Sequence, residues 1–88
     1  MRLNDAAGRF EREEEGQVVF ADFRQADGRL ILDHVEAPAA LRGSGAAGRL
    51  MEEIAAYARA EGLRIIPLCG YAAAWLRRSR EHRDLVGA

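Results

Sequence analysis

The chain has 88 residues, of which 49% are hydrophobic and 31% charged, and its net charge is −1. This length predicts a single domain over residues 1–88, and the near-zero charge provides no general attraction for nucleic acid or an anionic membrane. One cysteine cannot form an internal disulfide, and the absence of lysine excludes Schiff-base enzymes. Because the N-terminus lacks the apolar core of a signal peptide, a cytoplasmic location is expected.

The first half of the chain predicts antiparallel strands. A short strand is expected around residues 8–12, and a second one at Gln17–Arg24, which is rich in β-branched and aromatic residues. Asp27-Gly28 is a strong hairpin signal, after which a strand returns over Arg29–Glu36. Simple alternation in that returning strand places Leu30, Leu32, His34 and Glu36 on one face and Ile31, Asp33, Val35 and Ala37 on the other.

A long amphipathic helix is the clearest element of the second half. Apolar residues recur there with helical spacing at Ala47, Leu50, Met51, Ile54, Ala55 and Ala58. Gly62 is a natural stop for this helix. A short buried strand around Ile65-Ile66 and a closing helix at Tyr71–Arg78 follow.

This order of elements predicts an α+β fold, in which antiparallel strands are followed by helix, strand and helix. The helices should pack on a central mixed sheet. The strands before and after the long helix should be parallel, because a helix joins them by a right-handed crossover.

Glycine is concentrated where the long helix begins, in the segment Arg42–Gly48. A glycine in a helix costs about 1 kcal/mol relative to alanine, so a purely structural helix start should not contain three of them. Glycines do expose backbone N–H groups at the positive end of the helix dipole, where an anion can approach closely. The segment therefore predicts a phosphate-binding site.

Two familiar phosphate loops fit the segment poorly. A Walker loop needs a lysine, and all 13 basic residues of this chain are arginine. Residues 43–48 match the dinucleotide fingerprint G-x-G-x-x-G, but the next strand runs into Cys69 and Gly70 and does not end in an acidic residue that could hold a ribose. The 40 residues after Gly48 are also too few for the remaining units of a dinucleotide-binding domain.

A third type of loop fits more of the chain. Pro38–Ala47, with Leu50 in the helix, resembles the pyrophosphate loop of the GNAT superfamily of acetyl-CoA-dependent N-acetyltransferases. That loop has the pattern [Q/R]-x-x-G-x-[G/A], and Arg42, Gly45 and Ala47 occupy its marked positions. Residues 33–38 and 58–69 also resemble a branch of very small, single-domain GNAT proteins, so the likeness extends over about residues 10–86.

The resemblance implies a small GNAT-like fold that binds acetyl-CoA and transfers its acetyl group to an amine. The expected cofactor-binding residues are Ala37, Arg42, Gly43, Ser44, Gly45, Ala46 and Ala47. In this arrangement the loop holds the pyrophosphate, the pantetheine pairs with the strand that ends at Ala37, and the thioester lies near Cys69. No metal, nucleic-acid or membrane partner is expected, whereas the acceptor could be a small molecule, a peptide or a protein.

Cys69 follows the short buried strand, close to the position expected for the thioester. In the small branch that the chain resembles, a cysteine here is the proposed acetyl acceptor, and the N-terminus of the next helix would favour its thiolate. The branch usually has proline after this cysteine, whereas this chain has Gly70. The alternative is a structural role, since a free cysteine often only fills space in a core.

Amine acetylation also needs a base, and His34 and Glu36 share a strand face two residues apart. Either could accept the proton of the amine, and the pair could equally be a solvated strand face. Asp33 and the acidic run Glu13–Glu15 are interpreted as surface charges.

Four arginines near the C-terminus, Arg77, Arg78, Arg80 and Arg83, raise the possibility of nucleic-acid binding. The overall charge opposes it, and a solvated helix end with favourable cations explains them better. The sequence thus predicts a minimal acetyl-CoA-dependent N-acetyltransferase. The second hypothesis is a CoA-binding module without catalysis, because a fold can retain a ligand site and lose turnover.

Overall fold

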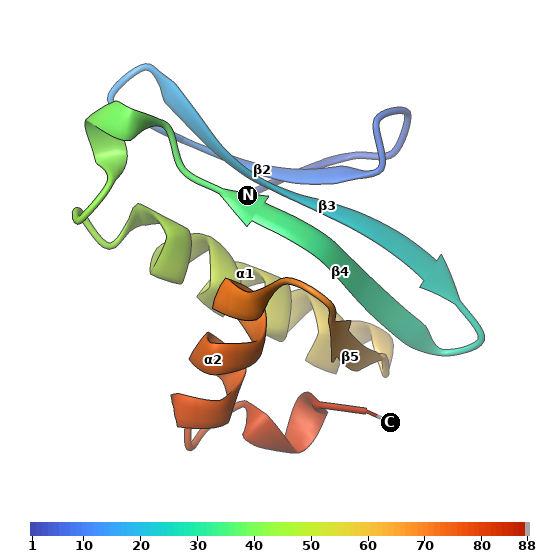
Figure 1. Cartoon of the computed structure of the whole chain (residues 1–88). Helices are drawn as coiled ribbons and strands as arrows, with labels where there is room; N and C mark the ends of the chain where they lie inside the picture. Colours follow the sequence, from blue (N-terminus) through green and yellow to red (C-terminus); the bar gives the residue numbers. More distant parts are fainter. Residues whose placement is uncertain (88) are drawn as a thin grey trace.

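A computed structural model describes residues 1–87 (Figure 1). The strands are β1 (Arg2–Asn4), β2 (Arg9–Glu14), β3 (Gln17–Ala26), β4 (Arg29–Glu36) and β5 (Arg64–Pro67). The helices are α1 (Ala46–Glu61) and α2 (Gly70–Arg78), with short 3-10 turns η1 (Ala39–Leu41) and η2 (Arg83–Leu85). Within residues 1–87, no helix is both long and apolar enough to cross a membrane.

The five strands form one mixed sheet in the order β1-β2-β3-β4-β5. The first four are antiparallel and β5 is parallel to β4, which confirms the predicted α+β class and the parallel pair around α1. Glu15-Gly16 and Asp27-Gly28 make the two hairpin turns, and both residues of each pair have positive φ, as tight turns between twisted strands require. Sequence reasoning missed β1, which has three residues and is too short to show alternation.

The predicted faces of β4 are wrong beyond Leu32. The register between β3 and β4 shifts there, since Phe23 pairs with Leu32 and Asp22 pairs with His34, so Asp33 is an extra residue in a bulge. The bulge turns Val35 into the core together with Leu30 and Leu32. His34 and Glu36 still share a face, but it is the outer, solvent-exposed face of the sheet.

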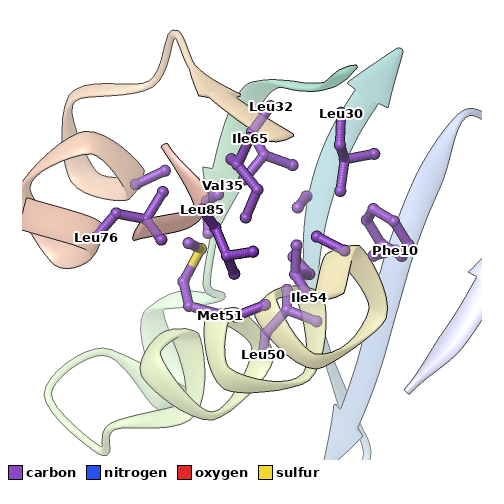
Figure 2. Packing of buried hydrophobic residues seen from close by; sticks show 14 of the residues in the cluster. Phe10, Leu30, Leu32, Val35, Leu50, Met51, Ile54, Ile65, Leu76 and Leu85 are labelled. Carbon is purple, nitrogen blue, oxygen red and sulfur yellow. The ribbon is translucent and has the colours of Figure 1, made fainter. Parts of the chain in front are cut away.

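Both helices contribute to a single hydrophobic core against one face of the sheet. Figure 2 shows Leu50, Met51 and Ile54 of α1 pointing toward side chains of the strands and toward Leu76 of α2. The residues with no exposed surface include Phe10, Val19, Leu30, Leu32, Leu50, Met51, Ile54, Ile65 and Leu76. This packing fixes the N-terminal ends of α1 and α2 relative to the end of β4, where the predicted site lies.

The segment after α2 folds back over β5 and α1. Arg59 of α1 donates two hydrogen bonds to Asp84, at 3.0 and 3.1 Å, and the N–H of Gly87 donates to the Ile65 carbonyl at 2.9 Å. His82 stacks on Trp75 with ring centroids 6.0 Å apart, and its Nε2 lies 2.9 Å from a Glu52 oxygen. The C-terminal segment is therefore tied to the body of the protein.

One acidic residue of the 13–15 run is structural, contrary to the interpretation of all three as surface charges. Glu14 has a side chain that is only 16% exposed, and it accepts two hydrogen bonds from Arg49, at 2.7 and 2.8 Å, and one from Arg12 at 2.6 Å. Arg12 also donates to Glu53 at 2.9 Å. Glu14 thus joins the end of β2 to the first turns of α1.

The Glu14 contacts predict a loss of stability in acid. Hydrogen bonds from Arg49 and Arg12 lower the pKa of Glu14 from 4.5 to about 2. Because the folded-state pKa is depressed, this stabilisation is complete above the unfolded value and is lost as the pH falls from about 4.5 to about 2. We expect Glu14→Gln to lower the melting temperature at pH 7 and to make it less dependent on pH between 5 and 2.5, as measured by calorimetry.

The matched control for this prediction is Glu13→Gln, which removes the same charge from an exposed neighbour. Its melting temperature should follow that of the parent protein at each pH. Equal behaviour of the two variants would show that the Glu14 contacts contribute nothing to stability.

Candidate functional site

The glycine-rich loop begins after η1 and leads directly into α1. Gly43 and Gly45 have φ values of 81° and 87°, in the left-handed region that favours glycine, and Gly45 is the N-cap residue of α1. Of the three glycines, only Gly48 lies inside the helix. The backbone conformation therefore accounts for Gly43 and Gly45 by itself, independently of any ligand.

The loop also has free backbone donors at the start of α1. Ser44 stabilises the turn, since its hydroxyl donates to the Leu41 carbonyl at 2.6 Å and accepts from the N–H of Ala46 at 3.2 Å. Within residues 1–87, the N–H groups of Ala47 and Gly48 donate no hydrogen bond. These two groups point out of the positive end of the helix, where an anion is stabilised.

A hollow of about 350 Å³ lies at this point, and we call it the loop hollow. Its lining consists of Ala37, Leu41, Arg42, Gly43, Gly45, Ala46, Ala47, Gly48 and Tyr71. Six of the seven predicted cofactor-binding residues line this hollow, all except Ser44. Five of the six belong to the loop, and Ala37 directly follows β4. In the described part of the chain the Arg42 guanidinium has no hydrogen-bond or ion-pair partner, so its charge is available to a ligand.

Tyr71 of α2 is a site residue that sequence reasoning missed. A Cβ atom added at Gly48 would lie 3.8 Å from the Tyr71 hydroxyl and 3.4 Å from Nε1 of Trp75. Gly48 therefore lets these two aromatic residues approach the first turn of α1. Burial raises the pKa of Tyr71, so its phenol is neutral at physiological pH. The spacing of Tyr71 and Trp75, one helical turn apart, was the available signal for a shared face.

The strands that flank α1 separate at the end next to the loop. Pairing of β4 with β5 runs from Arg29–Arg64 to Leu32–Pro67, followed by one more bond from the Leu68 N–H to the Leu32 carbonyl at 2.9 Å. Figure 1 shows that the rest of β4 continues toward the glycine-rich loop without β5 beside it. The β4 edge after Leu32 can thus receive an extended ligand through its backbone.

This combination of a glycine-rich loop before α1 and parallel strands that separate beside it agrees with a comparison of sequences. Residues 9–85 match the family described as GCN5-related N-acetyl-transferase. The chain belongs to this family. Membership supports acetyl transfer as the general activity, and for the family it implies an acyl-CoA donor and an acceptor substrate. A search of curated proteins finds no significant match to the chain.

In this family member, Cys69 is the N-cap residue of α2, in an extended conformation. Its side chain is partly exposed and packs in part against the hydrophobic core. The helix begins directly after it, as predicted. Gly70 does not need to be glycine, because its φ lies outside the left-handed region and a Cβ atom there would meet nothing within 4 Å. The neighbouring Leu68 side chain is 60% exposed, which leaves an apolar surface beside the thiol.

The structure places His34 and Glu36 together, on the outer face of the sheet. Nε2 of His34 lies 3.1 Å from a carboxylate oxygen of Glu36, and both side chains are about half exposed. The Leu68 N–H donates a hydrogen bond to the Leu32 carbonyl. His34 is two residues after Leu32 in β4, and Cys69 directly follows Leu68, just beyond β5. The three candidate catalytic residues are thus at the same end of the sheet, but Cys69 packs in part against the core, whereas His34 and Glu36 lie on the outer face and are open to solvent.

Proposed function

We propose that this protein transfers the acetyl group of acetyl-CoA to an amine through an acetyl-cysteine intermediate on Cys69. The observation that carries the proposal is the loop hollow, where Arg42 and the N–H groups of Ala47 and Gly48, none of which has a partner within residues 1–87, lie at the start of α1. A pyrophosphate matches these donors in charge and in its number of acceptor oxygens. The hollow also has apolar surface from Ala37 and Leu41 for the part of CoA that follows.

The binding mode follows the direction of β4. Arg42 and the loop N–H groups hold the pyrophosphate, and the pantetheine amides pair with the free β4 edge as far as Ala37. Ala37 lines the loop hollow and directly follows β4, so one ligand can contact both surfaces. This places the thioester between the end of β4 and Leu68-Cys69, where β5 no longer pairs with β4.

In the first chemical step, the Cys69 thiolate attacks the carbonyl carbon of the thioester. A bond forms from the Cys69 sulfur to the acetyl carbon, the bond from that carbon to the CoA sulfur breaks, and CoA leaves as a thiolate that takes up a proton from solvent. Cys69 is the N-cap residue of α2, so its sulfur lies at the positive end of that helix. Tyr71 is a neutral phenol on the wall of the loop hollow and can donate a hydrogen bond to CoA bound there.

In the second step, the acceptor amine attacks the acetyl-cysteine. The carbon–nitrogen bond forms, the carbon–sulfur bond to Cys69 breaks, and the thiolate is regenerated. The proton lost by the amine goes to His34, whose hydrogen bond to Glu36 orients the ring. Solvent can then remove this proton, because both side chains are half exposed.

A CoA-binding module without turnover is the second candidate. It is favoured by one observation, the partial packing of Cys69 against the core, which suits a structural cysteine. In that case the loop hollow would still bind CoA, and no covalent product would form.

Mass spectrometry of the intact protein after incubation with acetyl-CoA tests the two candidates. We expect a mass increase of one acetyl group, about 42 Da, that peptide mapping assigns to Cys69 and that hydroxylamine removes, as it does for a thioester. Incubation with CoA instead of acetyl-CoA is the control and should give no increase. Binding of acetyl-CoA without any covalent acetyl would support the module and contradict the covalent route.

A further inference from the structure

A second hollow, of about 430 Å³, lies on the opposite face of α2 from the loop hollow, and we call it the tail hollow. Its lining residues are Pro67, Ala73, Arg77, Arg83 and Val86. Ala73 and Arg77 are one helical turn apart, and they are rotated by about 200° from Tyr71 and Trp75, which face α1. Cys69, the N-cap residue of α2, is two residues from Pro67, which lines the tail hollow, and two residues from Tyr71, which lines the loop hollow.

The tail hollow carries positive charge that no contact within residues 1–87 neutralises. Arg77 and Arg83 have no hydrogen-bond or ion-pair partner within residues 1–87. The segment 77–83 contains four arginines and only one carboxylate, Glu81. Asp84, the next carboxylate, is held by Arg59 at 3.0 Å. Elsewhere, by contrast, arginines such as Arg12, Arg24 and Arg49 are paired with carboxylates.

We propose that the tail hollow binds the acyl acceptor, and that Arg77 and Arg83 select an acidic peptide whose amine is presented to Cys69. This inference rests on the proposed function, since it assigns the acceptor side of the same reaction. The loop hollow would hold the donor on one face of α2 and the tail hollow the acceptor on the other. Arginine forms paired hydrogen bonds with carboxylates, and the apolar surface of Pro67, Ala73 and Val86 suits the carbon atoms of a peptide.

The dimensions of α2 define the peptide further. Arg77 is eight residues beyond Cys69, which corresponds to about 12 Å along the helix axis. An extended peptide advances about 3.3 Å per residue, so its carboxylate should lie roughly three or four residues from the acetylated amine. A free α-amino acid is too short for this distance, because its amine and carboxylate are separated by a single carbon atom.

Nucleic acid fits the tail hollow less well than an acidic peptide does. Binding to a phosphate backbone needs a continuous basic surface, whereas this protein has a net charge of −1, and several of its arginines, Arg9 and Arg24 among them, are paired with carboxylates. The walls of the hollow are also mostly aliphatic and contain no aromatic side chain on which a base could stack.

Two blocked synthetic peptides, each with one lysine, test the proposal. One has glutamate at the third and fourth positions after the lysine, and the other has glutamine there. We expect acetylation of the glutamate peptide with a KM at least fivefold lower than that of the glutamine peptide. The double variant Arg77→Gln/Arg83→Gln should abolish this difference and leave the affinity for CoA unchanged. Arg80→Gln, which removes an exposed arginine outside the hollow, should retain the difference.

Calorimetric titration of the protein with each peptide keeps this test separate from that of the proposed function. If the parent protein binds the glutamate peptide and the double variant does not, the acceptor site is supported even without detectable acetyl transfer. Equal binding of both peptides, or no binding of either, would overturn it. Salt-dependent binding of single-stranded RNA that requires Arg77 and Arg83 would also overturn it, because the positive charge would then serve nucleic acid.

Discussion

Replacing Arg42 by alanine should weaken CoA binding by about tenfold to a hundredfold, because a charge-assisted hydrogen bond contributes roughly 1.5–3 kcal/mol. The change should leave the fold intact, since the Arg42 side chain is exposed and has no partner within residues 1–87. Isothermal titration of the purified protein with CoA measures the affinity. A melting curve of the variant measures its stability, which should stay within about 0.5 kcal/mol of the parent protein.

Arg80→Ala is the matched control for Arg42→Ala. It also removes one exposed arginine that has no partner in the described chain, but it lies outside the loop hollow. Its affinity for CoA should equal that of the parent protein. If Arg42→Ala and Arg80→Ala bind CoA equally well, the pyrophosphate lies elsewhere and the loop hollow is not the donor site.

The conformation of the loop decides which substitutions can test binding. Valine at Gly45 would have to adopt a φ of 87°, and its Cβ would lie 3.0 Å from a guanidinium nitrogen of Arg49. That substitution would strain the helix start itself, so a loss of affinity could not be separated from a loss of stability. Arg42 is a better probe because it changes a side chain that the fold does not use.

Most of the secondary structure could be predicted from the sequence because each element has a local signal. Asp27-Gly28 indicated the hairpin, and the spacing of Leu50, Met51 and Ile54 indicated α1, which the structure confirms. The β4 faces could not be predicted in full. Alternation assumes one residue per pairing position, and the bulge at Asp33 is set by the register of β3 against β4, which is a tertiary property.

The site was predictable to the extent that it is contiguous in sequence. Residues 42–47 form one loop, and the structure places most of them around a single hollow with Ala37. Tyr71 and the tail hollow were not predictable, because they depend on how α2 packs against α1 and on how the C-terminal segment returns to β5. The same packing explains Gly48, which the sequence analysis counted among the glycines of the helix start but not among the binding residues, and which admits Tyr71 and Trp75.

The position of Cys69 makes its two possible roles separable. As N-cap of α2 its side chain is partly exposed, which suits a nucleophile, and packs in part on the core, which suits a structural residue. If Cys69 is structural, its thiol contributes mainly by filling space. Cys69→Ala should then destabilise the fold at least as much as Cys69→Ser, and both should have little effect on transfer. If Cys69 is the nucleophile, both substitutions should prevent acetylation at position 69.

We expect Cys69→Ser and Cys69→Ala to bind CoA nearly as well as the parent protein, because the thiol does not line the loop hollow. Neither variant should become acetylated at position 69, since serine is a far weaker nucleophile at neutral pH and alanine is none. Transfer to an amine should fall at least about tenfold, which corresponds to ~1.4 kcal/mol in the activation barrier. The measurements are calorimetry with CoA, intact mass and the rate of amine acetylation. Transfer at the parent rate in Cys69→Ser would exclude the covalent route, and direct attack of the amine on acetyl-CoA, with His34 or Glu36 as base, would replace it.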